Sequence, residues 1–346
     1  MELSAGLLDV ADGLGIDESF CPVRAMLGAF VTGNHFPIPD LLTCSVGATC
    51  DDFSAIAQRL EGLGHKILWW EAPHRRPVES GEGSVVLGGG FVGPRPQVDF
   101  VKTQLQMVRR ALAEVSGEEL DDEKLAAGIR QANVVRRHLR ELRELVFTAK
   151  RCPMGALEML VAEMFAIHFC SDRDETIEIL GLLLDEVKGR IELGKGVGDS
   201  GAARIFWVNP VADLQVMNLL EDCGGRICGT EYLFSHALDA IAEDVEPMEA
   251  LARAALADPM VGSAQDRAER IGADIVRFGA EAVIVSRIPG ASHCTLEGRI
   301  IADYVQETLG MSALEIEVSP VSDSIAASLG MRMEALVETV LQRRKT

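Results

Sequence analysis

LLTCSVGATCDDFSAIAQRLEGLGHKILWWEAP, residues 41–73, contains two short apolar runs on either side of a segment with helical periodicity. The runs LLTCSV (41–46) and HKILWWEAP (65–73) are predicted to be strands, and the segment from Cys50 to about Gly62 is predicted to be a helix. A strand, a helix and a second strand in this order form the building block of a parallel sheet. The stretch therefore predicts an α/β fold.

The second half of the chain repeats this rhythm. Strands are predicted at 204–210, 225–232, 281–287 and 312–318, with helices between them and a final helix at 325–343. These strands are nearly continuous apolar runs, as a sheet covered on both faces requires. We therefore predict two doubly wound, Rossmann-like parallel-sheet domains with a helical segment between them.

The domain boundaries are predicted from changes in composition. The three regions are an N-terminal α/β domain with Cys21 and Cys50 (1–96), a helical region (97–200) and a C-terminal α/β domain with Cys294 (201–346). Residues 74–96 are rich in Gly and Pro and are predicted to be a loop. GKGVGDSG (194–201) is similar to a phosphate-binding loop but lacks its Gly-Lys-Ser/Thr ending, so we expect a linker and no ATP hydrolysis by this chain.

Charge and hydropathy exclude several classes of function. The formal net charge of −20 argues against nucleic-acid binding and against an anionic membrane surface, because both need a basic face. No apolar run approaches the ~18 residues of a membrane-spanning helix, and residues 1–13 lack the basic start and apolar core of a signal peptide. We expect a cytoplasmic enzyme with reduced thiols, so its eight cysteines favour metal ligation or buried thiols over disulfides.

Three cysteines stand where the chain is predicted to pass from a loop or strand into a helix. They are Cys21 in SFCPVRAMLGAF, Cys50 in GATCDDFSAIAQRL and Cys294 in SHCTLEGRIIADYV. A helix N-terminus carries unpaired N–H groups and a partial positive charge, which favour a thiolate, the form that binds soft metals. Their similar contexts suggest ligands that converge on one buried iron–sulfur cluster, in which one iron has no protein ligand.

The other cysteines have a structural interpretation and, for three of them, a functional alternative. Cys44 on a predicted strand is expected to be a core thiol, and Cys152 and Cys170 in the helical region are expected to be structural. Cys223 and Cys228 are separated by four residues, which is not a zinc-site spacing. Cys44, Cys223 and Cys228 are the candidates for additional ligands if the cluster is larger.

Loop residues near the three cysteines are candidates for proton transfer and for phosphate binding. His293 and His35 are the preferred proton donors, and His74 is a weaker candidate, because histidine titrates near neutral pH. Arg75 and Arg76 are either contacts for the phosphates of coenzyme A or a solvated pair in the loop.

Seven segments together resemble one known family. They are FCPVRAMLGA (20–29), TCDDF (49–53), SGEELDDEKLAAGIRQANVVRRHLREL (116–142), LLEDCGGRICGTEY (219–232), VEPMEALA (245–252), EAVIVSRIPGASHC (281–294) and LGMRMEALVETV (329–340). In this order and spacing, the chain resembles the subunits of the 2-hydroxyacyl-CoA dehydratase and benzoyl-CoA reductase family over nearly its whole length.

The resemblance implies a [4Fe–4S] cluster held by Cys21, Cys50 and Cys294, with the fourth iron open to water, hydroxide or substrate. It implies two kinds of partner: an ATP-dependent iron–sulfur activator protein that delivers one low-potential electron, and a paralogous subunit or a second copy of the chain. The expected reaction is the radical dehydration of a 2-hydroxyacyl-CoA or the reduction of an aromatic acyl-CoA.

Three alternatives remain open from the sequence. The first is a reductase of small molecules with a double-cubane [8Fe–9S] cluster, for which Cys44, Cys223 and Cys228 would supply further ligands. The second is a non-catalytic subunit that relays electrons to a paralogue. The third is an α/β binding protein without a cluster, in which the cysteines are core thiols.

Overall fold

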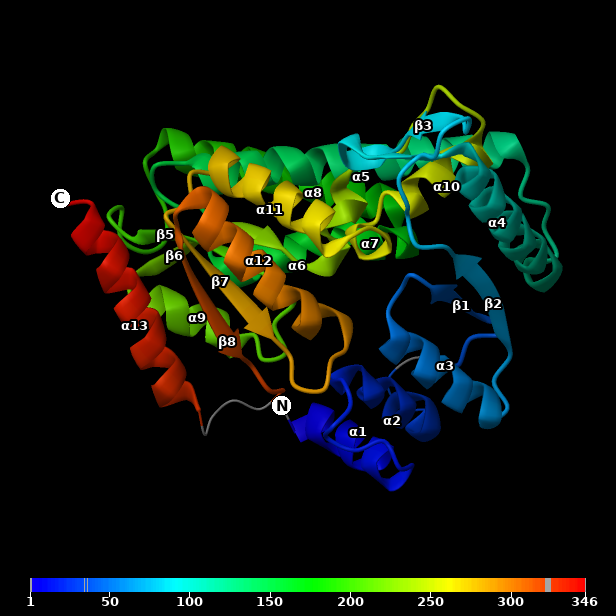
Figure 1. The fold of residues 1–346 in the computed structure, drawn as a ribbon, viewed down its shortest axis with the longest axis horizontal. Coiled ribbons are helices and arrows are strands. Elements are labelled where there is room, and N and C mark those ends of the chain that lie inside the picture. The colour runs from blue at the N-terminus through cyan, green and yellow to red at the C-terminus, as the bar shows by residue number, and fades with distance from the viewer. Residues whose placement is uncertain (1, 34, 36, 321–324, 346) are drawn as a thin grey trace. The chain divides into compact units, whose positions relative to one another are not determined.

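The computed structural model describes residues 2–33, 35, 37–320 and 325–345, without the side chains of residues 2–5, 293 and 294 (Figure 1). The chain folds into two compact units. Unit 1 comprises residues 1–130, 241–263 and 289–295, and unit 2 comprises residues 131–240, 264–288 and 296–346. Among the described helices, none is both long and apolar enough to cross a membrane.

The first part of unit 1 contains the predicted strand–helix–strand motif. Its elements are α1 (Glu2–Gly13), the 3-10 turn η1 (Pro22–Arg24), α2 (Ala25–Thr32), β1 (Leu42–Gly47), α3 (Asp51–Gly62) and β2 (Ile67–Ala72). β1 and β2 pair in parallel, which confirms the expectation from residues 41–73. Leu27 and Phe30 of α2 pack with Ile56 and Leu60 of α3 in one apolar core.

The rest of unit 1 contains a short hairpin and two packed helices. The elements are β3 (Ser84–Val86), η2 (Gly88–Gly90), β4 (Val92–Pro94), α4 (Arg95–Ser116), the start of α5 (Asp122–Thr148), α10 (Pro247–Leu256) and η5 (Pro259–Val261). β3 and β4 pair antiparallel, so the prediction of a loop throughout 74–96 is wrong for these residues. Strands of three residues are too short to produce a periodic pattern in the sequence.

Unit 2 is built on a four-stranded parallel sheet. Its strands are β5 (Ala203–Val208), β6 (Gly225–Glu231), β7 (Ala282–Arg287) and β8 (Ser312–Glu317), in the spatial order β6-β5-β7-β8. All three strand pairs are parallel, which confirms the predicted α/β class. Because the chain leaves β5 first toward β6 and then returns to β7 on the other side, the topological switch point lies between β5 and β7.

Helices cover both faces of this sheet. They are the remainder of α5, α6 (Ala156–Glu163), α7 (Phe165–His168), η3 (Phe169–Ser171), α8 (Arg173–Glu192), α9 (Gln215–Asp222), η4 (Leu233–Leu238), α11 (Ala264–Arg277), α12 (His293–Leu309) and α13 (Ala326–Arg343). Phe206 and Val208 join a core with residues of α5, α8, α11 and α12, whereas Ile205 and Trp207 join a core with residues of α6, α9 and α13. The uninterrupted apolar strands of the sequence therefore correspond to a sheet buried on both faces.

Candidate functional site

Cys21 occupies the N-cap position of η1, and this 3-10 turn continues directly into α2. Pro22 follows in the first position of the turn, where the N–H that proline lacks would have no helical partner. The side chain of Cys21 is partly buried. The predicted position at the start of a helical segment is confirmed.

Cys50 occupies the equivalent position of α3, three residues after β1 ends. Its carbonyl accepts a hydrogen bond from the N–H of Ser54 at 3.3 Å, and Asp51 and Asp52 form the first turn of the helix. The Cys50 side chain is partly buried, and its Sγ lies 3.9 Å from Oδ2 of Asp52. The predicted helix start is confirmed here as well.

Gly290 brings the segment that leads to Cys294 against the segment that leads to Cys21. A Cβ atom on Gly290 would lie 2.6 Å from the carbonyl carbon of Phe20 and 2.9 Å from that of Ser19. Gly290 also has a φ of 74°, a conformation that side-chain-bearing residues seldom adopt. The backbone immediately before Cys21 is therefore in direct contact with the loop after β7.

Asp52 joins the same loop to the segment that carries Cys50. Its buried carboxylate accepts hydrogen bonds at Oδ2 from the Ser292 N–H at 3.0 Å and from the Ser292 hydroxyl at 3.1 Å. Cys294 is the second residue of α12, two positions after Ser292, and its side chain lies outside the described part of the chain. The three cysteine-bearing segments thus meet within unit 1.

The sequence did not single out Asp52, Ser292 and Gly290, because each looks like an ordinary capping or loop residue. The signals available were the acidic residue two positions after Cys50 and the Gly-Ala-Ser run before Cys294. Neither signal indicates which distant residue it will contact.

Burial, rather than the helix terminus, has the largest effect on the acidity of Cys50 and Cys44. Burial raises the pKa of the Cys50 thiol, and the nearby carboxylates of Asp52 and Asp51 act in the same direction, although backbone N–H groups oppose them. Burial also raises the pKa of Cys44, and a small contribution comes from Cys50. The backbone N–H groups at the helix start favour the Cys50 thiolate, as expected, but burial outweighs them.

The donor set fits an iron–sulfur cluster. Cys21 and Cys50 supply partly buried sulfur in the same unit as the backbone of Cys294, and iron–sulfur clusters are held by cysteine thiolates. Metal binding deprotonates a thiol, so a thiol with a raised pKa still serves as a ligand and releases its proton when the metal binds. Among the described side chains, which exclude that of Cys294, no group of three His, Cys, Asp or Glu residues is arranged to hold a metal ion.

The candidates for a larger cluster are distributed over the two units. Cys44 lies on β1 of unit 1, where its Sγ is 3.5 Å from the Ser45 carbonyl oxygen. Cys228 is fully buried in β6 of unit 2, and burial raises its pKa to about 12. Cys223 ends α9 of unit 2, with Sγ 3.7 Å from the carbonyl oxygen of Gly330. Cys228 belongs to the apolar core of its sheet, as expected for a structural thiol.

The predicted proton donors differ in position. His35 is exposed in a bend between α2 and β1. His293 is the first residue of α12, next to Cys294, and its side chain is outside the described residues. His74 places Nδ1 2.6 Å from the Val261 carbonyl oxygen, which is a structural contact within unit 1.

Arg75 and Arg76 both contact protein groups. Arg75 is buried, donates to the carbonyl oxygen of Leu256 at 2.6 Å and stacks 4.0 Å from the centre of the Phe91 ring. Arg76 forms a two-pronged ion pair with Glu82. These contacts favour a structural interpretation over phosphate binding.

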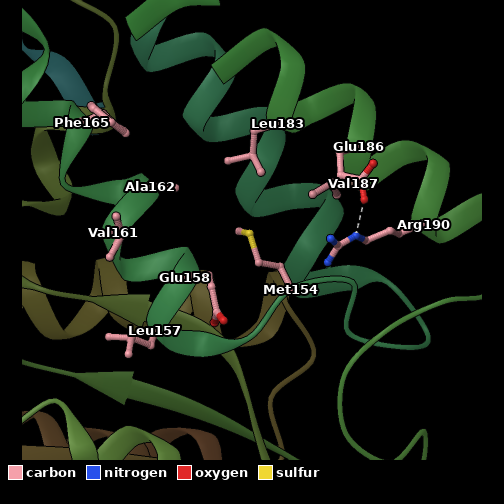
Figure 2. A pocket seen from close by; sticks show the side chains of 10 residues that line it. All are labelled: Met154, Leu157, Glu158, Val161, Ala162, Phe165, Leu183, Glu186, Val187 and Arg190. Atoms are coloured by element: carbon pink, nitrogen blue, oxygen red, sulfur yellow. Dashed lines mark hydrogen bonds and ion pairs between the residues drawn. The ribbon is translucent and has the colours of Figure 1, made fainter. Parts of the chain in front are cut away.

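Unit 2 contains a cavity of about 570 Å³ between α6 and α8 (Figure 2). It is lined by Met154, Leu157, Glu158, Val161, Ala162, Phe165, Leu183, Glu186, Val187 and Arg190. Arg190 donates from Nε to Glu186 at 2.7 Å at one side. None of these lining residues is a cysteine or histidine.

Residues 2–340 match the model of a protein family described as 2-hydroxyglutaryl-CoA dehydratase, D-component. This match covers nearly the whole chain. Among curated proteins, none matches.

Proposed function

The chain belongs to the family of the 2-hydroxyglutaryl-CoA dehydratase D-component, and on this premise we propose that it binds a [4Fe–4S] cluster through Cys21, Cys50 and Cys294. It is a dehydratase-type subunit, and the proposed reaction is the one-electron dehydration of a 2-hydroxyacyl-CoA. The family description favours dehydration over the reduction of an aromatic acyl-CoA.

One observation carries the proposal: the contacts of Gly290 with Phe20 and of Ser292 with Asp52 gather the three cysteine-bearing segments in unit 1. These cysteines are far apart in sequence, yet each stands at the start of a helical segment. Backbone contacts of this kind hold ligands at a site, because they limit the freedom of the residues that follow.

When bound, a cluster with one iron not ligated by protein supplies a low-potential electron and an open coordination position for an acyl-CoA oxygen. The residues of the chain hold and shield the site. Asp52 and Ser292 fix the two segments on which Cys50 and Cys294 lie, and the partial burial of Cys21 and Cys50 restricts water. We assign proton transfer to a ring nitrogen of His293, with His35 as the second candidate.

The proposed partners are an ATP-dependent iron–sulfur activator protein, which delivers the electron, and a paralogous subunit or a second copy of the chain. The core position of Cys228 speaks against the double-cubane alternative, because a buried strand thiol in an apolar core has no room for iron.

The test is the content of iron and acid-labile sulfide per chain, measured on full-length protein purified without oxygen, with electron paramagnetic resonance spectra before and after reduction. About four of each per chain supports the proposal. About eight iron atoms would replace it with the double-cubane reductase, and the absence of both elements would overturn it. Loaded protein is then mixed with an activator, ATP and 2-hydroxyacyl-CoA thioesters to measure dehydration.

A further inference from the structure

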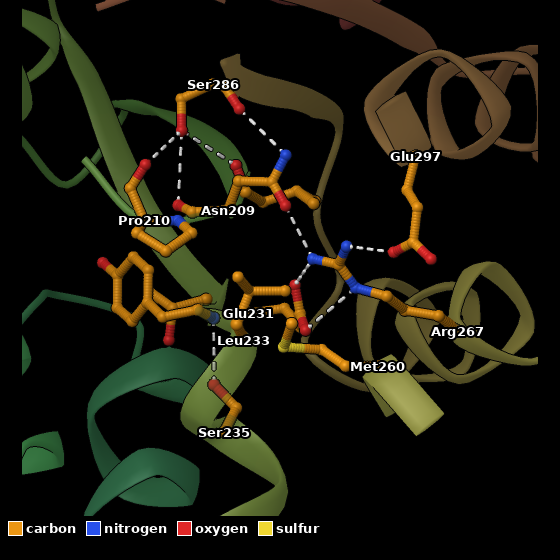
Figure 3. A network of polar contacts seen from close by, with 12 residues as sticks. Asn209, Pro210, Glu231, Leu233, Ser235, Met260, Arg267, Ser286 and Glu297 are labelled. Carbon is orange, nitrogen blue, oxygen red and sulfur yellow. Dashed lines mark hydrogen bonds and ion pairs between the residues drawn. The ribbon is translucent and has the colours of Figure 1, made fainter. Parts of the chain in front are cut away.

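Arg267 of α11 is the centre of a buried ionic network in unit 2 (Figure 3). Its side chain is fully buried and donates to Glu231 at 2.6 Å, to Glu297 at 2.7 Å and to the Asn209 amide oxygen at 2.6 Å. Burial disfavours the guanidinium charge, but the two carboxylates outweigh it and raise the pKa of Arg267. The guanidinium of Arg267 therefore stays protonated within the network.

Asn209 has a strained backbone at this network. It follows β5 directly, and its φ of 74° makes it the one non-glycine residue with a positive φ in the described part of the chain. Its amide group donates to the Ser286 carbonyl oxygen at 2.9 Å and accepts from Arg267. A strained conformation persists only where its surroundings hold it in place, and such positions concentrate at functional sites.

The network fills the carboxyl edge of the sheet at the switch point. Asn209 directly follows β5, Glu231 is the last residue of β6, and Ser286 lies near the end of β7. Ser286 Oγ is 2.9 Å from the Pro210 carbonyl oxygen and accepts from the Trp207 indole at 3.2 Å. Open α/β sheets commonly bind ligands at this edge, but here the polar side chains bond to one another.

Two residues connect this edge to α12. Glu297 accepts from Arg267, and a Cβ atom on the adjacent Gly298 would lie 3.1 Å from Val285 Cγ1 of β7. Glu297 and Gly298 follow Cys294 by three and four residues in one continuous helix. Glu297 and Gly298 therefore belong to the helical turn that directly follows Cys294.

We propose that the Arg267–Glu297 ion pair, together with the close packing of Gly298 on β7, positions the first turn of α12 and thereby Cys294 as a cluster ligand. This inference rests on the proposed function, since it gives the network a role only if Cys294 binds iron. Arg267 and Glu297 are positioning residues: they act through the helix that carries Cys294.

Unit 2 offers a matched control in a second buried ion pair. Arg143 of α5 donates to Glu163 of α6, and both side chains are as buried as those in the Arg267 network. Arg143 also donates to the Thr230 hydroxyl at 2.7 Å, and Thr230 is the neighbour of Glu231 on β6. Arg143 and Glu163 therefore contact the face of β6 opposite to the one that carries Glu231. Neither residue lies on α12.

The experiment compares full-length Glu297→Gln with Glu163→Gln, both purified without oxygen. Glu297→Gln keeps the Glu231 partner of Arg267, so the variant is expected to fold. The loss of the ion pair leaves the first turn of α12 less firmly held, and displacing a supporting group of a metal site weakens it by about 10-fold at most when the group does not touch the ligand. We therefore expect iron release to a chelator to be faster by up to about 10-fold, with shifted g values in the reduced protein. Glu163→Gln is expected to match the parent protein in both measurements.

Gly298→Ala provides a second variant, because alanine favours the helix while its methyl group would lie 3.1 Å from Val285 Cγ1, so that either Val285 or α12 has to shift. It is expected to change iron release and g values in the same direction as Glu297→Gln. If Glu297→Gln and Gly298→Ala behave like the parent, or if Glu163→Gln changes the spectrum equally, the inference is wrong. If the parent protein itself binds no iron, the proposed function is wrong.

Discussion

The carboxyl end of β1 in unit 1 and the carboxyl ends of β5 and β7 in unit 2 are equivalent positions in parallel sheets, but they are occupied differently. In unit 1, Cys50 follows β1 with a partly buried thiol whose Sγ lies 3.9 Å from the Asp52 carboxylate. In unit 2, Asn209, Ser286 and Arg267 are fully buried and bond to one another. The same topology thus yields a candidate ligand site in one unit and a closed polar network in the other.

The cysteines of the two units show the same contrast. Cys21 and Cys50 lie at helix starts and are partly buried, whereas Cys228 lies inside the sheet with a pKa of about 12. A thiol becomes a ligand where the backbone leaves it accessible to a metal, and it becomes part of the core where apolar groups surround it. The following predictions test this contrast.

The largest expected effect is the loss of iron from Cys50→Ala. Removing one of three ligands is expected to reduce bound iron from about four per chain to below one, measured by elemental analysis of protein purified without oxygen. Cys228→Ala is the matched control and is expected to keep its iron while losing about 1 kcal/mol of stability. Equal iron in the Cys50 variant and the parent, or iron loss in the Cys228 variant, would contradict the distinction between the two units.

The second effect concerns the closed network. Arg267→Met leaves the carboxylates of Glu231 and Glu297 buried without their cation, and we expect a loss of about 3–5 kcal/mol in the free energy of unfolding. Urea denaturation followed by circular dichroism measures it. Arg299→Ala removes an exposed ion pair with Asp303 and is expected to cost at most about 1 kcal/mol. If the two variants have similar urea midpoints of unfolding, burial does not increase the contribution of the Arg267 ion pairs to stability.

The third effect concerns the contact between the segments of Cys50 and Cys294. Ser292→Ala removes the hydroxyl donor to Asp52 but leaves the backbone donor, so we expect a loss of about 1 kcal/mol. Hydrogen exchange of residues 288–295 is expected to become faster. Thr339→Ala, which removes a hydroxyl bonded to its own helix at Ala335, serves as the control. Unchanged exchange in Ser292→Ala would show that the hydroxyl does not hold this loop.

The smallest effect is expected from a partly exposed ion pair of unit 1. Hydrogen bonds from Arg95 and Arg253 lower the pKa of Glu249 below its usual range. A carboxyl group with a lowered folded-state pKa stabilises the fold above its unfolded pKa of about 4.3, and this stabilisation disappears as the pH falls through the folded value. Glu249→Gln is therefore expected to unfold at a lower temperature than the parent at pH 7, by the equivalent of about 1 kcal/mol or less. The two melting temperatures are expected to converge in strong acid, and a difference that persists there would exclude this electrostatic origin.

Much of the fold was predictable from local sequence patterns. The strand–helix–strand motif of residues 41–73 and the four strands of unit 2 appear where the apolar runs predicted them. The helix starts at Cys21, Cys50 and Cys294 were also predictable, because proline, acidic residues and loop residues mark them. The hairpin of β3 and β4 was missed, because each of its strands has three residues.

The sequence by itself determined the α/β class, the order of the strands along the chain and the positions of the cysteines at helix starts, because apolar periodicity and capping residues are local properties. Only the tertiary structure decided that Gly290 contacts Phe20, that Ser292 contacts Asp52, and that Arg267 is buried between Glu231 and Glu297. Arg267 stands in QDRAER, which resembles an exposed helix surface, and its partners lie 36 and 30 residues away. Contacts over such distances depend on how the sheet folds back on itself, and no local pattern encodes them.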